Sequence, residues 1–251
     1  MILLKSDREL EKMRVSGQIT AEVLSEVTQI IEPGIETIEL DRFCDKLVRL
    51  KGAIPAFKGY RGFPGSICVS INEEVVHGIP KKRKLKNGDI VSIDFGVLCD
   101  GYYGDKAITL AVGLISHEKQ QLLKVTEEAL WKGIEQAIPG NRLGNISNAI
   151  EKHILMHKFS IVRDYVGHGI GRSMHEEPQI PNYGDPGEGP LLKEGMVFAI
   201  EPMVNMGTHA VRTLNDGWTV ITRDKKPSAH FENTVAITES GPEVLTCLKK
   251  S

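Results

Sequence analysis

The stretch that decides the fold is Ser92-Ile93-Asp94-Phe95-Gly96-Val97-Leu98-Cys99-Asp100-Gly101-Tyr102-Tyr103-Gly104-Asp105. The apolar, β-branched run 89–93 leads into it and favours a β-strand, and Asp100-Gly101 is a strong signal for the two-residue turn of a hairpin. With that pair in the turn, Asp94 lies opposite Ala107. Asp105 then points to the same face as Asp94, because side chains alternate along a strand. The sequence therefore predicts two neighbouring carboxylates on one face of a hairpin.

These two carboxylates need compensation if they lie on the inner face of an apolar hairpin. Buried charges are costly unless they are paired, protonated or bound to metal. A divalent cation would resolve the conflict, and oxygen ligands this close together suit one or two ions. The alternative is a solvated hairpin with two surface aspartates, and the hairpin alone does not decide between the two interpretations.

Length and composition are ordinary for a globular protein. The 251 residues carry a formal net charge of −2, which argues neither for nor against a nucleic-acid partner. The four cysteines lack CxxC spacing, which indicates reduced thiols and not a disulfide framework or a zinc knuckle. The apolar part of residues 1–6 is too short for a signal peptide, and no apolar run reaches membrane-spanning length. We expect a cytoplasmic protein that does not enter a membrane.

Two helices are predicted ahead of the hairpin. Ser6-Asp7-Arg8-Glu9 has the spacing of a capping box, so a helix should begin there and run to about Ile31, before Pro33-Gly34. A second helix should run from about Ile38 to Leu50, with Thr37 as its cap. A strand at 66–71 should follow it.

The same order of elements then begins again. Ser116 should cap a helix that runs to about Ala137 and stops at Pro139-Gly140, and a shorter helix over 146–158 should lead into a β-rich run at 161–166. Residues 85–94 and 192–201 also match each other, which makes a weak internal repeat. We predict one α+β domain over 1–251, with halves of about 1–112 and 113–251, each carrying helices on one side of an antiparallel sheet.

Asp94 falls on Glu201 in this repeat, so two acids should meet across a pseudo-twofold axis. Further candidates are His168 in Gly167-His168-Gly169-Ile170-Gly171 and Glu232 within the run 229–237. Taken alone, a glutamate at a strand end is usually a surface charge, and a histidine among glycines is usually structural. Together the candidates supply four carboxylates and one imidazole, a set that suits divalent Mn, Fe, Co or Zn. They are Asp94, Asp105, His168, Glu201 and Glu232.

The combined motifs resemble the type I methionine aminopeptidases, whose pita-bread fold is shared with prolidase, aminopeptidase P and creatinase. The resemblance runs nearly the full length of the chain. The short span of 26 positions from His175 to Glu201, together with the lack of an N-terminal extension, resembles type I and not type II. The motifs are Ser70-Ile71-Asn72-Glu73-Glu74-Val75-Val76-His77-Gly78-Ile79-Pro80, the hairpin 94–105, Gly167 to Arg172, His175-Glu176-Glu177-Pro178, Glu201-Pro202 and Phe231-Glu232-Asn233-Thr234.

The resemblance implies two divalent ions per chain, with Asp94 and Glu232 bridging them. Asp105 would complete the ligand set of one ion, and His168 and Glu201 would complete that of the other. A water held between the ions would become the nucleophile for the first peptide bond. By the same resemblance Glu201 would shuttle the proton, while His77 and His175 would position the substrate and donate to the developing oxyanion and amide nitrogen.

The implied substrate is the N-terminus of a nascent polypeptide, from which the initiator methionine is removed when the second residue is small. The free α-amine would bind a metal, which explains why only a chain end is cut. A flexible thioether packs well against aromatic rings and sulfur. The resemblance places the methionine pocket at Phe57, Tyr60, Phe63, Cys68, Met174 and Trp218.

Four residues depart from the usual family pattern. They are Phe57 in place of cysteine, Phe63 in place of tyrosine, Met174 in place of phenylalanine, and Asn233 in place of histidine. These departures bear on the shape of the pocket and not on the type of reaction. For Phe57 and Phe63 taken individually, an ordinary place in the core is the simpler interpretation.

Two other signals are weaker. His153 and His157 have helical spacing, but Ile154 occupies the place of the acid in a His-Glu-x-x-His zinc motif, so no zinc role is indicated. The basic run 81–86 is by default a solvated loop. Its alternative role is contact with ribosomal RNA, because phosphate contacts dominate such affinity.

Two rival functions stay open at this point. One is a related pita-bread peptidase, either an X-Pro aminopeptidase or a prolidase. The other is a non-catalytic binding protein with the same fold, although relatives of that kind have lost metal ligands and none is lost here. A monomer is expected.

Overall fold

The computed structural model describes residues 1–248, which contain four α-helices and one short 3-10 helix. The helices are α1 (Asp7–Thr28), α2 (Thr37–Leu50), η1 (Tyr60–Gly62), α3 (His117–Ile134) and α4 (Leu143–Met156). The strands of the first half are β1 (Ile54–Pro55), β2 (Cys68–Ile71), β3 (Glu74–Val76), β4 (Ile90–Cys99) and β5 (Tyr102–Ala111). Those that follow α4 are β6 (Ser160–Ile161), β7 (Gly167–Gly169), β8 (Glu176–Ile180), β9 (Val197–Ile200), β10 (Met203–Asn205), β11 (Val211–Thr213), β12 (Val220–Thr222), β13 (Ser228–His230), β14 (Asn233–Thr238) and β15 (Gly241–Val244).

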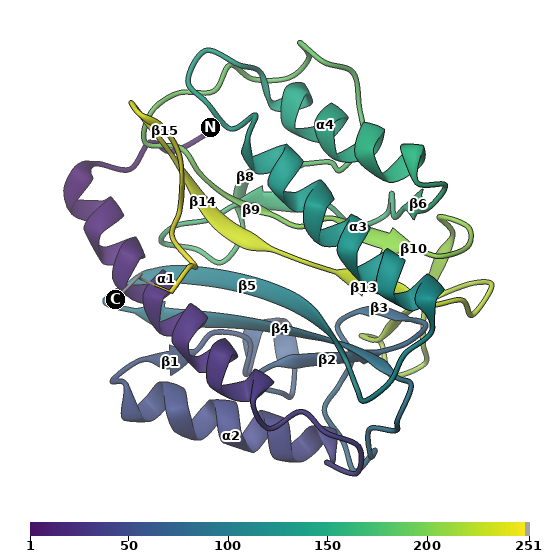
Figure 1. The fold of residues 1–251 in the computed structure, drawn as a ribbon. Helices are drawn as coiled ribbons and strands as arrows, with labels where there is room; N and C mark the ends of the chain where they lie inside the picture. Colours follow the sequence, from purple (N-terminus) through teal and green to yellow (C-terminus); the bar gives the residue numbers. More distant parts are fainter. Residues whose placement is uncertain (249–251) are drawn as a thin grey trace.

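The strands lie between two outer pairs of helices. Helices α1 and α2 cover one side, α3 and α4 cover the other, and the long strands β5 and β14 run between them (Figure 1). In the first half β4 pairs with β1, β2 and β5, and in the second the order is β15-β14-β9-β7-β8. Every one of these pairings is antiparallel. The predicted α+β class with antiparallel sheets and outer helices is confirmed.

The central hairpin forms in the predicted register. Cys99 pairs with Tyr102 around the two-residue turn, and Asp94 lies opposite Ala107. Asp100 and Gly101 both have positive φ, 48° and 79°, as a type I′ turn requires. Asp105 lies opposite Gly96, two positions from the partner of Asp94, so the two carboxylates are diagonal neighbours on one face.

The two halves are joined along β5. Thr234 accepts a hydrogen bond from the Asp105 N–H and donates one to the Asp105 carbonyl, both at 2.9 Å. The Glu232 N–H donates to the Ala107 carbonyl at 2.9 Å, and Thr109 makes a similar two-way link with the His230 backbone. These bonds fix the segment around Glu232 directly beside the strand that carries Asp105.

The core consists of an apolar layer under each pair of helices. Leu40, Cys44 and Val48 follow the one-face spacing of a helix on α2 and pack beneath β4. Strand β4 is buried from Ile90 to Val97, because α1 and α2 cover one face and the second half covers the other. A strand buried on both faces holds its polar side chains in an environment of low dielectric constant.

Several sequence predictions about the elements need correction. Helix α3 ends at Ile134, earlier than Ala137, and α4 begins at Leu143, earlier than residue 146. Helix α1 ends at Thr28, earlier than Ile31, because Gln29 and Ile30 already close the last turn with short-range bonds to the carbonyls of Glu26 and Val27. Glu36 and not Thr37 caps α2. The Thr37 hydroxyl donates instead to the Lys81 carbonyl at 2.8 Å.

A further correction concerns the run 161–166, in which only Ile161 belongs to a strand. Val162 still donates to the Met203 carbonyl at 3.0 Å, but the chain then bends away, and Tyr165 packs in a separate apolar cluster. The boundary between the predicted halves, near residue 112, stays a prediction, as does the single domain over 1–251.

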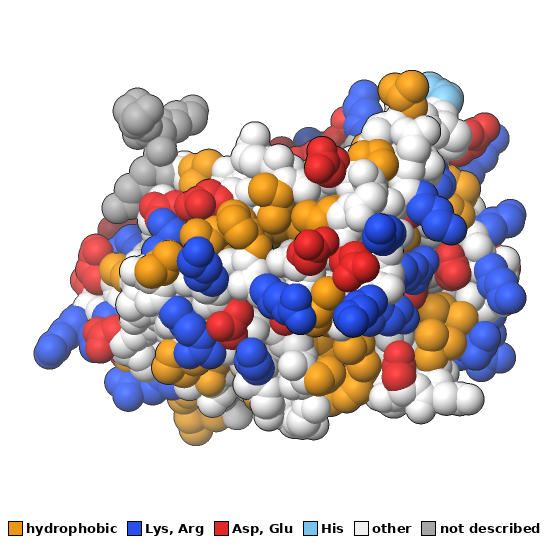
Figure 2. Space-filling view, turned by 90° about the horizontal axis from the view of Figure 1, so that it is seen from below, with side chains coloured by type: hydrophobic (Ala, Val, Ile, Leu, Met, Phe, Trp, Pro, Cys, Tyr) orange, Lys and Arg blue, Asp and Glu red, His pale blue; other side chains and the backbone are white. Residues whose placement is uncertain are grey.

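The outer face below α2 carries both signs of charge. Figure 2 shows Lys and Arg side chains interspersed with acidic and apolar ones on this face. Mixed charge of this kind fits the small formal net charge of −2. Among residues 1–248, no helix is both long and apolar enough to cross a bilayer.

Candidate metal centre and substrate pocket

Five predicted ligands line one cavity of about 140 Å³ between the two halves. Asp94 and Asp105 come from the β4–β5 hairpin, and Glu232 lies between β13 and β14. His168 is on β7 opposite Ala199, and Glu201 directly follows β9, where Pro202 ends the ladder. Neighbouring strand ends of the second half therefore bring His168, Glu201 and Glu232 against the hairpin of the first half.

The distances among these side chains suit a metal centre. The ligand atoms of Asp105, His168 and Glu232 all lie within 4.8 Å of one another. Nε2 of His168 is 3.6 Å from Oε1 of Glu201. Nδ1 of His168 bonds the Gly169 carbonyl at 2.9 Å, which fixes the proton on Nδ1 and leaves the lone pair of Nε2 facing the carboxylates.

Burial raises the pKa of every carboxyl in the cavity. Desolvation is the main cause for all four, and repulsion from the neighbouring carboxylates adds to it for Asp94, Glu201 and Glu232. The pKa of Asp105 rises to about 7, mainly because this side chain is buried. Desolvation and the nearby His175 lower the pKa of His168 to about 3, so this imidazole is neutral. The metal-free site is a group of acids that cannot all ionise together.

Several polar atoms in the cavity lack a partner. Asp94 Oδ1, Asp105 Oδ1 and Glu232 Oε1 are buried and have no hydrogen-bond partner within residues 1–248. Buried polar atoms are nearly always satisfied, so such a concentration of exceptions at one place calls for a ligand. Oxygen atoms with one imidazole form a donor set that divalent cations prefer. The residues therefore fit the predicted metal.

His230 is a residue of this site that the sequence did not reveal. Its side chain is buried, its Nε2 is 3.4 Å from Oε2 of Glu201, and it can form a ligand group with Glu201 and Glu232. Neither ring nitrogen has a hydrogen-bond partner among the described residues. Its position two residues before Glu232 was the available signal, because alternate residues of a strand share a face.

The remaining wall of the cavity is largely aromatic. Phe63 meets Trp218 edge to face with ring centroids 5.1 Å apart, and the buried Cys68 lies in the same wall. Desolvation holds the pKa of Cys68 well above its ordinary value, so its sulfur is a neutral thiol. Five of the six predicted pocket residues line the cavity: Phe57, Tyr60, Phe63, Cys68 and Trp218.

Met174, the sixth predicted pocket residue, is buried in an apolar cluster against which Phe57 packs. Phe57 packs against this cluster and Phe63 is buried, but both also line the cavity, so the simpler interpretation as ordinary core does not describe their whole environment. Arg61 also lines the cavity and was not predicted. It lies with its guanidinium carbon 5.4 Å from the Tyr60 ring centroid.

The two predicted non-ligand histidines both face the cavity. Nδ1 of His175 is 2.9 Å from the Tyr60 hydroxyl, and its ring lies 4.1 Å from that of His168, centroid to centroid. His77 meets Tyr165 and Trp218 edge to face. Desolvation, followed by the charge of Arg61, lowers the pKa of His175, and desolvation lowers that of His77 to about 4. Both imidazoles are therefore neutral N–H donors at neutral pH.

This arrangement of acids, imidazoles and aromatic wall can bind cations beside an apolar side chain. The model of metallopeptidase family M24 matches residues 11–239. The chain belongs to metallopeptidase family M24. The predicted family, and with it the assignment as a metallopeptidase, is confirmed.

Individual relatives in the family agree with this membership. "Methionine aminopeptidase 1" of Bacillus subtilis is 56% identical over 246 residues, which are 98% of this chain and 99% of the relative. The crystal structure of methionine aminopeptidase from Rickettsia prowazekii matches with a TM-score of 0.97 at 46% identity and covers 98% of this chain and 100% of its own. Prolidase from Pyrococcus furiosus shares the fold more distantly, with a TM-score of 0.79, 26% identity and coverage of 98% of this chain and 66% of its own. The pita-bread fold is thus confirmed.

Proposed function

We propose that this metallopeptidase removes the N-terminal methionine from nascent polypeptides whose second residue is small, and that it does so in the cytoplasm with two divalent ions. The observation that carries the proposal is the cluster of buried, unpartnered carboxylate oxygens that faces an aromatic pocket. The names of the close relatives support the choice of methionine.

The ions would be held by Asp94, Asp105, His168, Glu201 and Glu232. Cobalt, manganese, iron and zinc all suit this donor set, and cellular supply decides among them. When bound, the ions would lower the pKa of a water and polarise the scissile carbonyl. The substrate's free α-amine would supply a further nitrogen ligand, which would restrict cleavage to chain ends.

The chain's own residues would position the substrate and move the proton. Glu201 lies between His168 and His230, and would accept the proton of the attacking water and pass it to the leaving amine. With the proton of His175 on Nε2, Nδ1 would accept a hydrogen bond from the Tyr60 hydroxyl, and Nε2–H would donate to the developing oxyanion. His77 packs edge to face against the rings of Tyr165 and Trp218, and would donate a hydrogen bond to the substrate backbone.

The methionine side chain would occupy the aromatic part of the cavity. Phe63, Trp218 and the neutral thiol of Cys68 offer the soft, apolar contacts that a thioether prefers. Tyr60 and Phe57 complete the wall, and Met174 supports Phe57 from behind. The cavity of about 140 Å³ limits the size of the side chain that it can take.

The runner-up is cleavage at proline, because prolidase shares this fold. The test compares release of the first residue from Met-Ala-Ser and from Ala-Pro peptides, each with the metal-loaded protein and after chelation. We expect metal-dependent release of methionine and negligible turnover of Ala-Pro. Preferential cleavage of Ala-Pro would refute the proposed substrate, and a chain that binds no divalent ion at micromolar concentration would refute the metallopeptidase mechanism.

The basic run 81–86 is proposed as a contact to the ribosome, where nascent chains emerge. Arg83 is engaged with Glu74 at 2.7 Å, whereas the side chains of Lys81, Lys82, Lys84 and Lys86 are exposed. Binding to ribosomes should fall steeply with salt and weaken when these four lysines are changed to glutamine. Salt-independent binding would contradict this contact.

We also propose that the protein acts as a monomer.

A further inference from the structure

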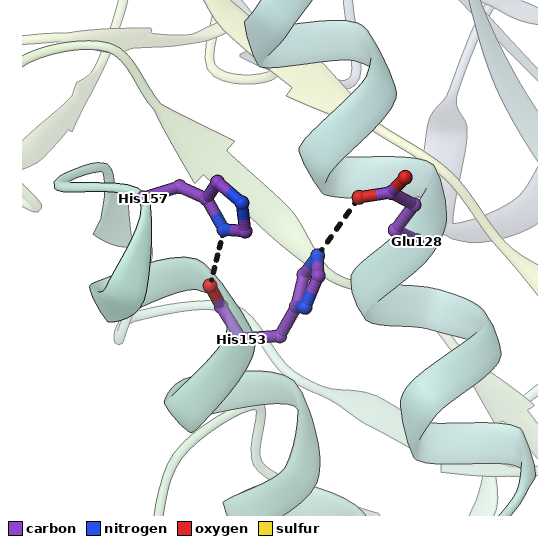
Figure 3. A group of neighbouring side chains, drawn as sticks. All are labelled: Glu128, His153 and His157. Carbon is purple, nitrogen blue, oxygen red and sulfur yellow. Dashed lines mark hydrogen bonds and ion pairs between the residues drawn. The ribbon is translucent and has the colours of Figure 1, made fainter.

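Outside the cavity, the structure brings together a second group of ligand-type side chains on the outer helices. Figure 3 shows His153 and His157 of the α4 end and Glu128 of α3 facing one another across the gap between the two helices. Their candidate ligand atoms all lie within 4.8 Å of one another. We propose that Glu128, His153 and His157 form a separate binding site for a transition-metal ion of the Zn²⁺ class.

The packing of α3 against α4 explains why these residues meet. A Cβ atom at Gly133 would lie 2.7 Å from the side chain of Ile150, so the two helices approach closely at this point. Because the helices run antiparallel, a step toward the start of α3 corresponds to a step toward the end of α4. Glu128, five positions before Gly133, therefore lies beside His153, three positions after Ile150. His157 lies one turn further on the same face.

Hydrogen bonds leave the imidazoles in a form that can bind metal. Nδ1 of His157 is 2.9 Å from the His153 carbonyl and can only donate to it, so the proton is on Nδ1 and the lone pair is on Nε2. A second ring nitrogen bonded to a backbone carbonyl is the usual support of a metal-bound histidine. Nε2 of His153 lies 3.1 Å from Oε2 of Glu128, and a cation can enter between them when His153 takes the tautomer with its proton on Nδ1.

The geometry and chemistry favour a borderline divalent cation. Two imidazole nitrogens and one carboxylate oxygen make a set of three protein ligands, which leaves a fourth position for water. Ligand atoms around tetrahedral zinc are about 3.3 Å apart at ordinary bond lengths. Small side-chain rotations would bring the three candidate ligand atoms, now within 4.8 Å of one another, to that separation. The side chain of His153 is 14% exposed and that of Glu128 is 41% exposed, so an ion can enter from solvent.

The remaining oxygen of Glu128 is already compensated. Lys124 Nζ lies 3.9 Å from Oε1, which leaves Oε2 as the oxygen directed to the histidines. An ion held here would tie α3 to α4, the two helices that cover the second sheet. Such a link would stabilise the folded chain, because only the folded chain brings the three ligands together.

This site differs from a His-Glu-x-x-His motif because its acid comes from another helix. Ile154 follows His153 in the sequence, and Glu128 lies 25 positions earlier. The packing of α3 against α4 therefore supplies the acid that the sequence motif lacks. None of the three residues lines the cavity of the proposed active site.

The test uses metal-loaded protein dialysed against micromolar Zn²⁺, with bound zinc counted per chain. His157→Gln and Glu128→Gln should each bind one equivalent of zinc less than wild type. All three proteins keep the cavity ligands, so zinc bound in the cavity does not contribute to this difference. His117→Gln is the matched control, an exposed histidine at the start of α3, and should bind as much zinc as wild type. Equal zinc in wild type and in both site variants would overturn the proposal.

A second measurement does not depend on the variants. In imidazole nitrogen NMR spectra of wild-type protein, Zn²⁺ should shift the Nε2 resonances of His153 and His157 and leave that of His117 unmoved. Zinc should also raise the melting temperature of wild type more than that of His157→Gln. Unmoved His153 and His157 resonances at saturating Zn²⁺ would refute the site. Methionine release by His157→Gln should equal that of wild type, which separates this inference from the proposed function.

Discussion

Removal of the divalent ions should make the stability of the protein fall as the pH rises from 6.5 to 8. Without metal, burial holds the pKa of Asp105 at about 7 and raises those of Asp94, Glu201 and Glu232 well above their ordinary values of 3.8 and 4.5. A raised pKa in the folded state stabilises the protein fully below the unfolded-state pKa, and this stabilisation is lost as the pH rises through the folded-state value.

The magnitude follows from the number of protons that the folded chain retains. Above pH 6.5 the unfolded chain has lost all four, so each carboxyl still protonated in the folded state lowers the free energy of unfolding by about 1.4 kcal/mol per pH unit. One carboxyl that stays protonated across this window contributes roughly 2 kcal/mol. The histidines oppose this effect only in part. The lowered pKa values of His77, His168, His175 and His230 keep these imidazoles neutral in the folded chain. The unfolded imidazoles are half protonated at pH 6.5, so each adds about 0.4 kcal/mol of stability by pH 8, against roughly 2 kcal/mol lost for each carboxyl that stays protonated.

The assay is urea unfolding at pH 6.5, 7.2 and 8.0, followed by circular dichroism. Metal-free protein should lose stability across the series, and protein saturated with Mn²⁺ should not, because metal-bound carboxylates carry no proton. Asp94→Asn should have a smaller slope. Asp100→Asn, at the exposed tip of the same hairpin, should keep the wild-type slope. Constant or rising stability of the metal-free protein would refute the account of the four carboxyls.

Three further changes test the packing and positioning around the site. Tyr60→Phe removes the hydroxyl that bonds His175 Nδ1 and should lower kcat about tenfold with little change in KM, measured on Met-Ala-Ser; an unchanged kcat would show that this bond does not orient the imidazole. Thr234→Val breaks both bonds to the Asp105 backbone and should cost about 1–3 kcal/mol in urea unfolding, together with weaker metal binding; intact stability would mean that the link between the halves lies elsewhere. Gly104→Ala places a Cβ atom 2.9 Å from the Gly17 nitrogen and should destabilise the protein by about 1–3 kcal/mol in the same assay. A stability equal to wild type would show that α1 and β5 can move apart without cost.

The hairpin and the helices beside it could be predicted because their signals are local. Asp100-Gly101 fixes the turn, and with it the register that places Asp94 opposite Ala107. Ser6 and Glu9 mark the start of α1 through a bond from the Ser6 N–H to the Glu9 carboxylate at 3.0 Å. The end of α1 was mistaken because short-range bonds close its last turn early, and the cap of α2 was mistaken because a neighbouring segment decides it. The Thr37 hydroxyl, for example, is taken by the Lys81 carbonyl.

The site was predictable only as a set of residue types, and its assembly depends on tertiary contacts. Local patterns placed Asp94 and Asp105 together, but Glu232 reaches them through hydrogen bonds between residues more than 120 positions apart, one backbone to backbone and one to the Thr234 hydroxyl. Arg61 was missed for this reason, since nothing near it in the sequence marks it as a cavity residue. His230 had a signal, its position two residues before Glu232. Glu128 is a further case, because only the packing of α3 on α4 brings it to His153.

The most direct test of the proposed centre is the number of Mn²⁺ ions bound by Asp94→Asn, measured together with its release of methionine from Met-Ala-Ser. Asp94 contributes a buried oxygen with no partner in residues 1–248, whereas the equally sized control Asp100→Asn changes an exposed hairpin tip. We predict two ions and full activity for wild type and Asp100→Asn, and fewer ions with loss of methionine release for Asp94→Asn. Two bound ions and wild-type activity in Asp94→Asn would contradict the account.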